Sequence, residues 1–116
     1  MNIIEMRVLN GELKYKNTTI LTYNIEYPEI ISSDYNFGKN TFNRYNRNIA
    51  LKLQNRVNNQ LYKEAMQLYE YNMANGYPIM IYEIILQYNI TYNKNSIVSL
   101  YADQYEFTRR CSRKYY

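Results

Sequence analysis

Two runs near the C-terminal end of the chain alternate between apolar and polar positions. From Met80 to Tyr92 the apolar and tyrosine residues fall mostly on even numbers, and residues 97–107 alternate again. A period of two is the pattern of a β-strand with one buried face. The residues between the runs, 93–96, are Asn-Lys-Asn-Ser, which favour a turn. The pattern therefore predicts a β-hairpin over residues 80–107.

Alternation also predicts strands in the first third of the chain. Thr18–Tyr27 alternates clearly, and we expect Pro28 to end this strand because proline has no N–H to donate to a neighbouring strand. Residues 1–16 are weakly patterned. They predict short strands on either side of a hairpin turn at Asn10-Gly11.

Between the predicted strands, apolar residues recur every three or four positions from residue 42 to residue 69. That spacing predicts one long amphipathic helix. Asn40 or Thr41 is the expected N-cap, and Asn75-Gly76 is the expected end. We expect a bend or loosening at Asn58-Asn59, because asparagine has low helix propensity.

These elements together predict a single α+β domain over residues 1–108, a small antiparallel sheet packed against one long helix. The apolar face of the sheet should meet one stripe of the helix, formed by Ile49, Leu53, Val57 and Leu61.

The net charge of +4 is concentrated at one end of the chain. Arg109, Arg110, Arg113 and Lys114 are four of the fourteen cations, so residues 1–108 carry the remaining ten cations and all ten anions. The body is therefore neutral, and residues 109–116 form an unpatterned basic tail. A neutral body argues against nucleic-acid binding.

Several kinds of chemistry are excluded by composition. The chain has no histidine, and its one cysteine, Cys111, lies in the tail. Histidine-based triads, histidine zinc sites and imidazole bases are therefore excluded, and we expect no catalytic residue, no metal and no cofactor. Asp103 and Glu106 are three positions apart on a strand and face opposite sides, so with Glu83 they do not form a carboxylate pair for glycoside chemistry.

One ordered set of residues resembles a known family. The set comprises Tyr27-Pro28-Glu29-Ile30 after a strand, Asn46 and Ile49 in the helix, and the final strand from Ile97 to Thr108. It resembles the PdaC/RsiV-type extracytoplasmic domain, and the resemblance covers Leu13–Thr108. That domain precedes the catalytic domain of the peptidoglycan deacetylase PdaC, and it occurs in the extracellular part of the anti-sigma factor RsiV, which binds lysozyme.

The resemblance implies a non-catalytic recognition domain of the Gram-positive cell envelope, extracytoplasmic or in the cell wall. Its partner would be wall glycan or a wall-directed protein such as lysozyme. The motif positions, structural or binding, are Tyr27, Pro28, Asn46, Ser99, Tyr101 and Tyr105.

Two other functions stay open from the residues. One is a nucleic-acid-binding module that uses tyrosines and basic residues, and the other is a truncated product without function of its own. The strand tyrosines could form a stacking platform for sugars or bases. We expect instead that they pack against the helix, because large aromatic residues mostly serve burial.

The tail departs from the family. Members usually continue with Gly-Gly-Ala-His-Gly, whereas this chain reads Arg-Arg-Cys-Ser-Arg from residue 109. With suitable codons, one added base converts Thr-Gly-Gly-Ala-His-Gly-Asn-Thr and the first two bases of the next codon into residues 108–116. We therefore interpret the tail as frameshifted, and expect it to be disordered or merely to extend the last strand.

The ends of the chain lead to two further expectations. Strands that a following region would cover should have open edges, which predicts a homodimer or a monomer that tends to self-associate. The chain contains no apolar run long enough for a membrane span, and its start has no export signal.

Overall fold

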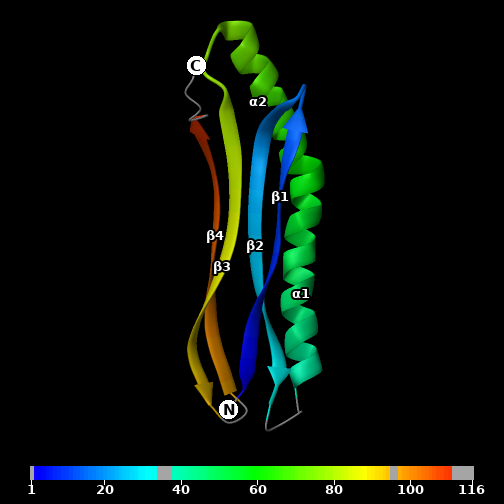
Figure 1. Ribbon diagram of the computed structural model, residues 1–116, viewed down its shortest axis with the longest axis vertical. Coiled ribbons are helices and arrows are strands. Elements are labelled where there is room, and N and C mark those ends of the chain that lie inside the picture. The colour runs from blue at the N-terminus through cyan, green and yellow to red at the C-terminus, as the bar shows by residue number, and fades with distance from the viewer. Residues whose placement is uncertain (1, 34–37, 95–96, 111–116) are drawn as a thin grey trace.

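A computed structural model describes residues 2–33, 38–94 and 97–110. In chain order the elements are β1 (Ile3–Tyr15), β2 (Thr18–Ser32), α1 (Lys39–Arg56), a π-helical segment η1 (Val57–Leu61), α2 (Tyr62–Asn75), β3 (Met80–Lys94) and β4 (Ile97–Arg110). The strands form one sheet in the order β1-β2-β3-β4, and the long helix runs alongside it (Figure 1).

The α+β class, with a sheet packed on one long helix, is confirmed. The two hairpins, β1/β2 and β3/β4, are antiparallel, but the central pair β2/β3 is parallel over residues 21–25 and 82–86. The sheet is therefore mixed rather than wholly antiparallel. The reason is the length of the helix, which carries the chain back along the sheet, so that β3 begins beside the start of β2 and runs in the same direction.

The helix loosens where the sequence predicted. Asn58 and Asn59 lie in η1, where the helix widens for one π-helical turn. The Asn59 side-chain amide donates to the backbone oxygen of Asn55 at 2.7 Å, which supports the widened turn. The helix ends at Asn75 with Gly76 in the left-handed conformation, as expected.

The start of the helix was predicted wrongly. The helix begins at Lys39 after Gly38, which has a φ of 82° and makes no side-chain cap hydrogen bond. Asn40 and Thr41 are inside the first turn instead of capping it.

Asn10-Gly11 is not a hairpin turn. β1 continues through both residues, and the turn lies at Lys16 and Asn17, whose φ values of 52° and 63° suit a tight hairpin. Gly11 has a different role: a Cβ there would lie 2.9 Å from the hydroxyl oxygen of Tyr23 on the paired strand. The glycine therefore makes room for the tyrosine ring.

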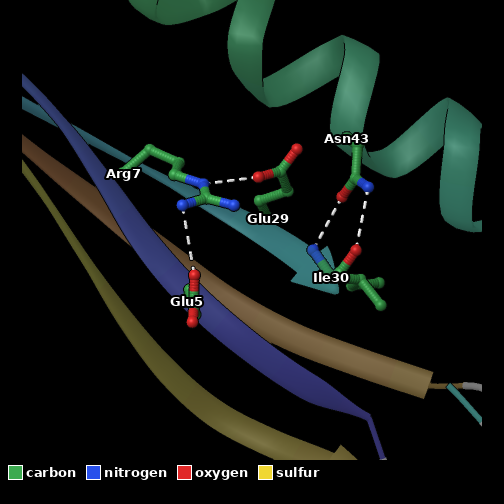
Figure 2. Close-up of polar contacts among 5 residues, drawn as sticks. All are labelled: Glu5, Arg7, Glu29, Ile30 and Asn43. Atoms are coloured by element: carbon green, nitrogen blue, oxygen red, sulfur yellow. Dashed lines mark hydrogen bonds and ion pairs between the residues drawn. The ribbon is translucent and has the colours of Figure 1, made fainter. Parts of the chain in front are cut away.

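Pro28 does not end β2, which continues to Ser32. Two residues further on, the backbone N–H of Ile30 donates to Asn43 Oδ1 at 2.7 Å, and Asn43 Nδ2 donates to the Ile30 oxygen at 3.0 Å (Figure 2). These groups of Ile30 therefore point away from β1. Residues two apart on a strand repeat this direction, so the nitrogen of Pro28 also points away from β1, and the missing N–H removes no bond from the β1/β2 ladder.

The predicted helix face is confirmed. Leu53, Val57 and Leu61 are buried, and Ile49 packs on the same core half-buried. The sheet contributes buried residues from its two central strands, namely Ile20, Leu21, Ile25, Ile84, Leu86 and Tyr88. The helix contacts β2 and β3, so the core lies between the helix and the middle of the sheet.

Leu53→Asp should unfold the domain, because it places an unpaired charge in this core. We expect the free energy of unfolding to fall by about 3 kcal/mol or more, measured by urea denaturation. Leu51→Asp is the matched control, since Leu51 lies on the same helix with 42% of its surface exposed. Similar stability of the two variants would contradict the helix face.

The outer strands β1 and β4 have no strand partner on their outer edges among the described residues. Free edges pair with other chains, so we expect concentration-dependent self-association in sedimentation velocity. Ala102→Lys places a charge on the exposed part of β4 and should shift the protein toward monomer. Asn89→Lys, on the inner strand β3, should not. A monomer at every concentration would contradict the expected homodimer.

Candidate functional site

The two faces of β4 have different surroundings. Even-numbered residues of β3, such as Ile84 and Leu86, are buried under the helix, and they pair with even-numbered residues of β4. Odd-numbered residues of β4 therefore lie on the face of the sheet away from the helix. We name this set the β4 row: Ser99, Tyr101, Asp103, Tyr105, Phe107 and Arg109.

The β4 row exposes three large aromatic side chains. Tyr101, Tyr105 and Phe107 have 52%, 47% and 44% of their surface accessible. At about 3.3 Å per residue the row from Tyr101 to Phe107 extends over about 20 Å. Clustered exposed apolar side chains are uncommon on a protein surface and mark binding sites.

The expectation that strand tyrosines pack against the helix holds for only part of the set. On β3, Tyr82 is half-buried and Tyr88 is buried, both on the helix side of the sheet. Burial raises the pKa of both hydroxyls. Tyr101 and Tyr105 lie on the other face, opposite Asn89 and Ile85. The difference is decided by the register of the hairpin, which places even residues beside even residues.

Polar groups lie beside the aromatic rings. Gln87 and Asn89 of β3 are exposed and pair with Asp103 and Tyr101 of the β4 row. Arg109 forms an ion pair with Glu83 on the same face. The surface thus combines stacking rings with amide and carboxylate groups that form hydrogen bonds.

Ser99 lies at an irregular point of the β3/β4 ladder. The register shifts between Ile90 and Tyr92, and the Thr91 hydroxyl donates to the backbone oxygen of Ser99 at 3.2 Å. Ser99 is exposed, so its own hydroxyl is accessible at the end of the β4 row.

The other motif positions do not join the β4 row. Tyr27 is half-buried against the core, Pro28 is fully buried in β2, and Asn46 is 3% exposed. The Asn46 side-chain amide donates to the backbone oxygen of Phe42 at 3.0 Å, one turn earlier in α1. Tyr27 and Pro28 thus pack in the protein, and Asn46 forms a hydrogen bond with the backbone. Ser99, Tyr101 and Tyr105, by contrast, come together on one surface.

Sequence reasoning did not single out Phe107, Gln87 and Asn89 as parts of a site. The signal was present in the alternation, since Phe107 has the same parity as Tyr101 and Tyr105. Without the register of the hairpin, however, the sequence does not show whether these odd-numbered residues face the helix or the opposite side of the sheet.

Glu106 of β4 and Glu83 of β3 each have an arginine partner. Asp103 and Glu106 lie on opposite faces, as expected. Glu106 accepts hydrogen bonds from Arg56 of α1, one of them from Nη2 at 3.0 Å, and the bond from Arg56 lowers the pKa of Glu106. Glu83 is bound to Arg109. This arrangement keeps Glu106 ionised near neutral pH, unlike a general acid, whose pKa must be raised.

The first two residues of the basic tail extend the last strand. Arg109 and Arg110 belong to β4, opposite Ile81 and Met80. This is one of the two arrangements expected for the tail. Residues 111–116, with Cys111, lie outside the described residues.

The family model described as deacetylase PdaC matches residues 14–108. The chain therefore belongs to the PdaC domain family, as the sequence resemblance predicted. No curated protein matches the chain. None of the helices in the described ranges has the length and apolar composition needed to cross a membrane.

The Arg56–Glu106 pair predicts a pH-dependent contribution to stability. The pKa of Glu106 is lowered in the folded protein, so the contribution is present above its unfolded pKa of about 4.3 and is lost as the pH falls through the folded value. At pH 7, Glu106→Gln should lower the free energy of unfolding by at most about 1 kcal/mol, since the pair is partly exposed.

Urea denaturation at pH 7 and pH 3 tests this. The difference in free energy of unfolding between wild type and Glu106→Gln should be smaller at pH 3 than at pH 7. Glu12→Gln is the control, because Glu12 is exposed and has no ion-pair partner among the described residues. An equal difference at both pH values would contradict the role of the ion pair.

Proposed function

We propose that this chain is a non-catalytic recognition domain of the bacterial cell envelope that binds wall glycan through the β4 row. The observation that supports this is the line of three exposed aromatic side chains on the face of the sheet away from the helix. Aromatic rings stack on the flat faces of ligand rings, and the neighbouring amide and carboxylate groups would bind hydroxyls.

Two features support a binding rather than a catalytic role. The chain has no histidine to act as a base or a metal ligand, and the nearby carboxylates Glu83 and Glu106 are bound to arginines. The deacetylase named in the family description would then owe its chemistry to a separate catalytic domain, as the resemblance implies.

Membership of the PdaC family supports an extracytoplasmic or cell-wall location in a Gram-positive organism. A wall-directed protein such as lysozyme is the second ligand that the resemblance implies. An extended face with tyrosine and phenylalanine side chains also suits a protein partner, because aromatic residues are enriched at such interfaces.

Binding of N-acetylglucosamine oligomers tests the glycan proposal. Tyr101→Ala and Tyr105→Ala should each weaken binding by about tenfold, since loss of one stacked ring costs about 1–3 kcal/mol in comparable sites. Tyr71→Ala is the control, because Tyr71 on α2 is 58% exposed and far along the chain from the β4 row. Isothermal titration calorimetry of the full chain measures all three.

Three results would overturn the glycan assignment. The first is no binding by the wild-type chain, and the second is equal loss in Tyr71→Ala. The third is nanomolar binding of DNA or RNA that weakens steeply with salt, which would favour a nucleic-acid module. If the chain binds lysozyme and not glycan, and Tyr101→Ala weakens that binding, the ligand of the β4 row is a protein.

A further inference from the structure

Helix α1 carries an uncompensated positive charge. Its sequence from Lys39 to Arg56 contains five cations and no acidic residue: Lys39, Arg44, Arg47, Lys52 and Arg56. Arg56 is bound to Glu106. Arg44 and Arg47 are exposed, and within the described ranges neither has an ion-pair or hydrogen-bond partner.

These two arginines line a cleft of about 510 Å³ beside the end of β2. The helix residues that line it recur at three- and four-residue spacing and so share one flank of α1. They are Asn40, Asn43, Arg44, Arg47, Asn48 and Leu51, and Glu29 of β2 completes the lining. The volume is in the range of small-molecule sites.

The polar groups on the sheet side of the cleft already have partners within the protein. Arg7 Nε donates to Glu29 at 2.5 Å, and Arg7 Nη1 lies 3.2 Å from Glu5 (Figure 2). The hydrogen bond to Glu29 raises the pKa of Arg7, so this guanidinium stays charged. Asn43 is held by its two bonds to the Ile30 backbone. Glu29, the one carboxylate that lines the cleft, is therefore neutralised by Arg7. The net charge of the cleft is positive because of Arg44 and Arg47.

The unused groups of the cleft define the chemistry of a ligand. Two guanidinium groups offer paired N–H donors that match the oxygens of a carboxylate or a phosphate. The side-chain amides of Asn40 and Asn48 have no partner among the described residues and offer both donors and acceptors to hydroxyls. Exposed Leu51 adds an apolar contact.

We propose that this cleft binds an anionic saccharide through a carboxylate or phosphate group held by Arg44 and Arg47. It is a second site, on the helix side of the molecule, and it is separate from the β4 row. The saccharide part of the ligand rests on the proposed envelope function, whereas anion binding by the cleft does not depend on it.

NMR titration of the ¹⁵N-labelled full chain tests the proposal with four probes: glucuronate, glucose 6-phosphate, inorganic phosphate and neutral glucose. The anionic probes should shift the side-chain signals of Arg44, Arg47, Asn40 and Asn48, and glucose should bind at least tenfold more weakly. Response to glucuronate alone or to the phosphates alone identifies which anionic group the cleft prefers, and either supports the proposal.

Variants separate a built site from general charge attraction. Arg44→Gln/Arg47→Gln should raise the Kd for the anions about tenfold or more, because charge-assisted hydrogen bonds are lost. Arg44→Lys/Arg47→Lys keeps the charge but loses the paired donors, and should show an intermediate loss. Lys63→Gln, which removes an exposed charge from α2, should have no effect. Circular dichroism melting checks that each variant is folded.

The proposal is overturned if neither anion produces shifts, if glucose binds as well as glucuronate, or if Lys63→Gln loses as much affinity as the arginine variants. Displacement of the anions by duplex DNA at nanomolar concentration would also overturn it, in favour of nucleic-acid binding. Tyr101→Ala should retain anion binding, so a failure of the β4 row and a failure of this cleft are distinguishable.

Discussion

The packing of one helix on the middle of a four-stranded sheet is the constraint on which the rest of the structure depends. A helix with its side chains is about 10 Å wide, and neighbouring strands are about 4.8 Å apart. One helix therefore covers about two strands. Here it buries Leu53, Val57 and Leu61 on β2 and β3. The outer strand β4 reaches the helix through the Glu106–Arg56 pair. The opposite face of the sheet receives no cover from the helix, and the aromatic β4 row lies on that face.

The short central pairing has a second consequence. β2 and β3 pair over residues 21–25 and 82–86 only, although each strand is 15 residues long. Beyond this pairing β2 needs another partner for its backbone, since unpaired polar groups are costly when buried. Asn43 of α1 supplies it at Ile30. The same contact fixes α1 beside Glu29 and so forms one wall of the arginine-lined cleft.

The two candidate surfaces differ in chemistry and position. The β4 row offers aromatic rings with amide and carboxylate neighbours, and the cleft offers free guanidinium groups with amides. Some other charges are paired locally, as in Arg56–Glu106, Arg109–Glu83 and Lys16–Glu70. Arg44 and Arg47 have no such partner within the described residues, and α1 contains no acidic residue one turn away from them.

Much of the fold was determined by the sequence alone. Periods of two and of three to four residues predicted the last hairpin, strand Thr18–Tyr27, the helix, its loosening at Asn58-Asn59 and its buried stripe, because these follow from local geometry and burial. Tertiary structure decided what no local rule contains. The hairpin register put Tyr101 and Tyr105 on the uncovered face. The pairing with β2 placed Gly11 inside a strand, beside the Tyr23 ring. The direction of the Pro28 nitrogen, away from β1, let β2 continue to Ser32. Each of these outcomes depends on a partner distant in the sequence, and such a partner is known only when the chain is folded.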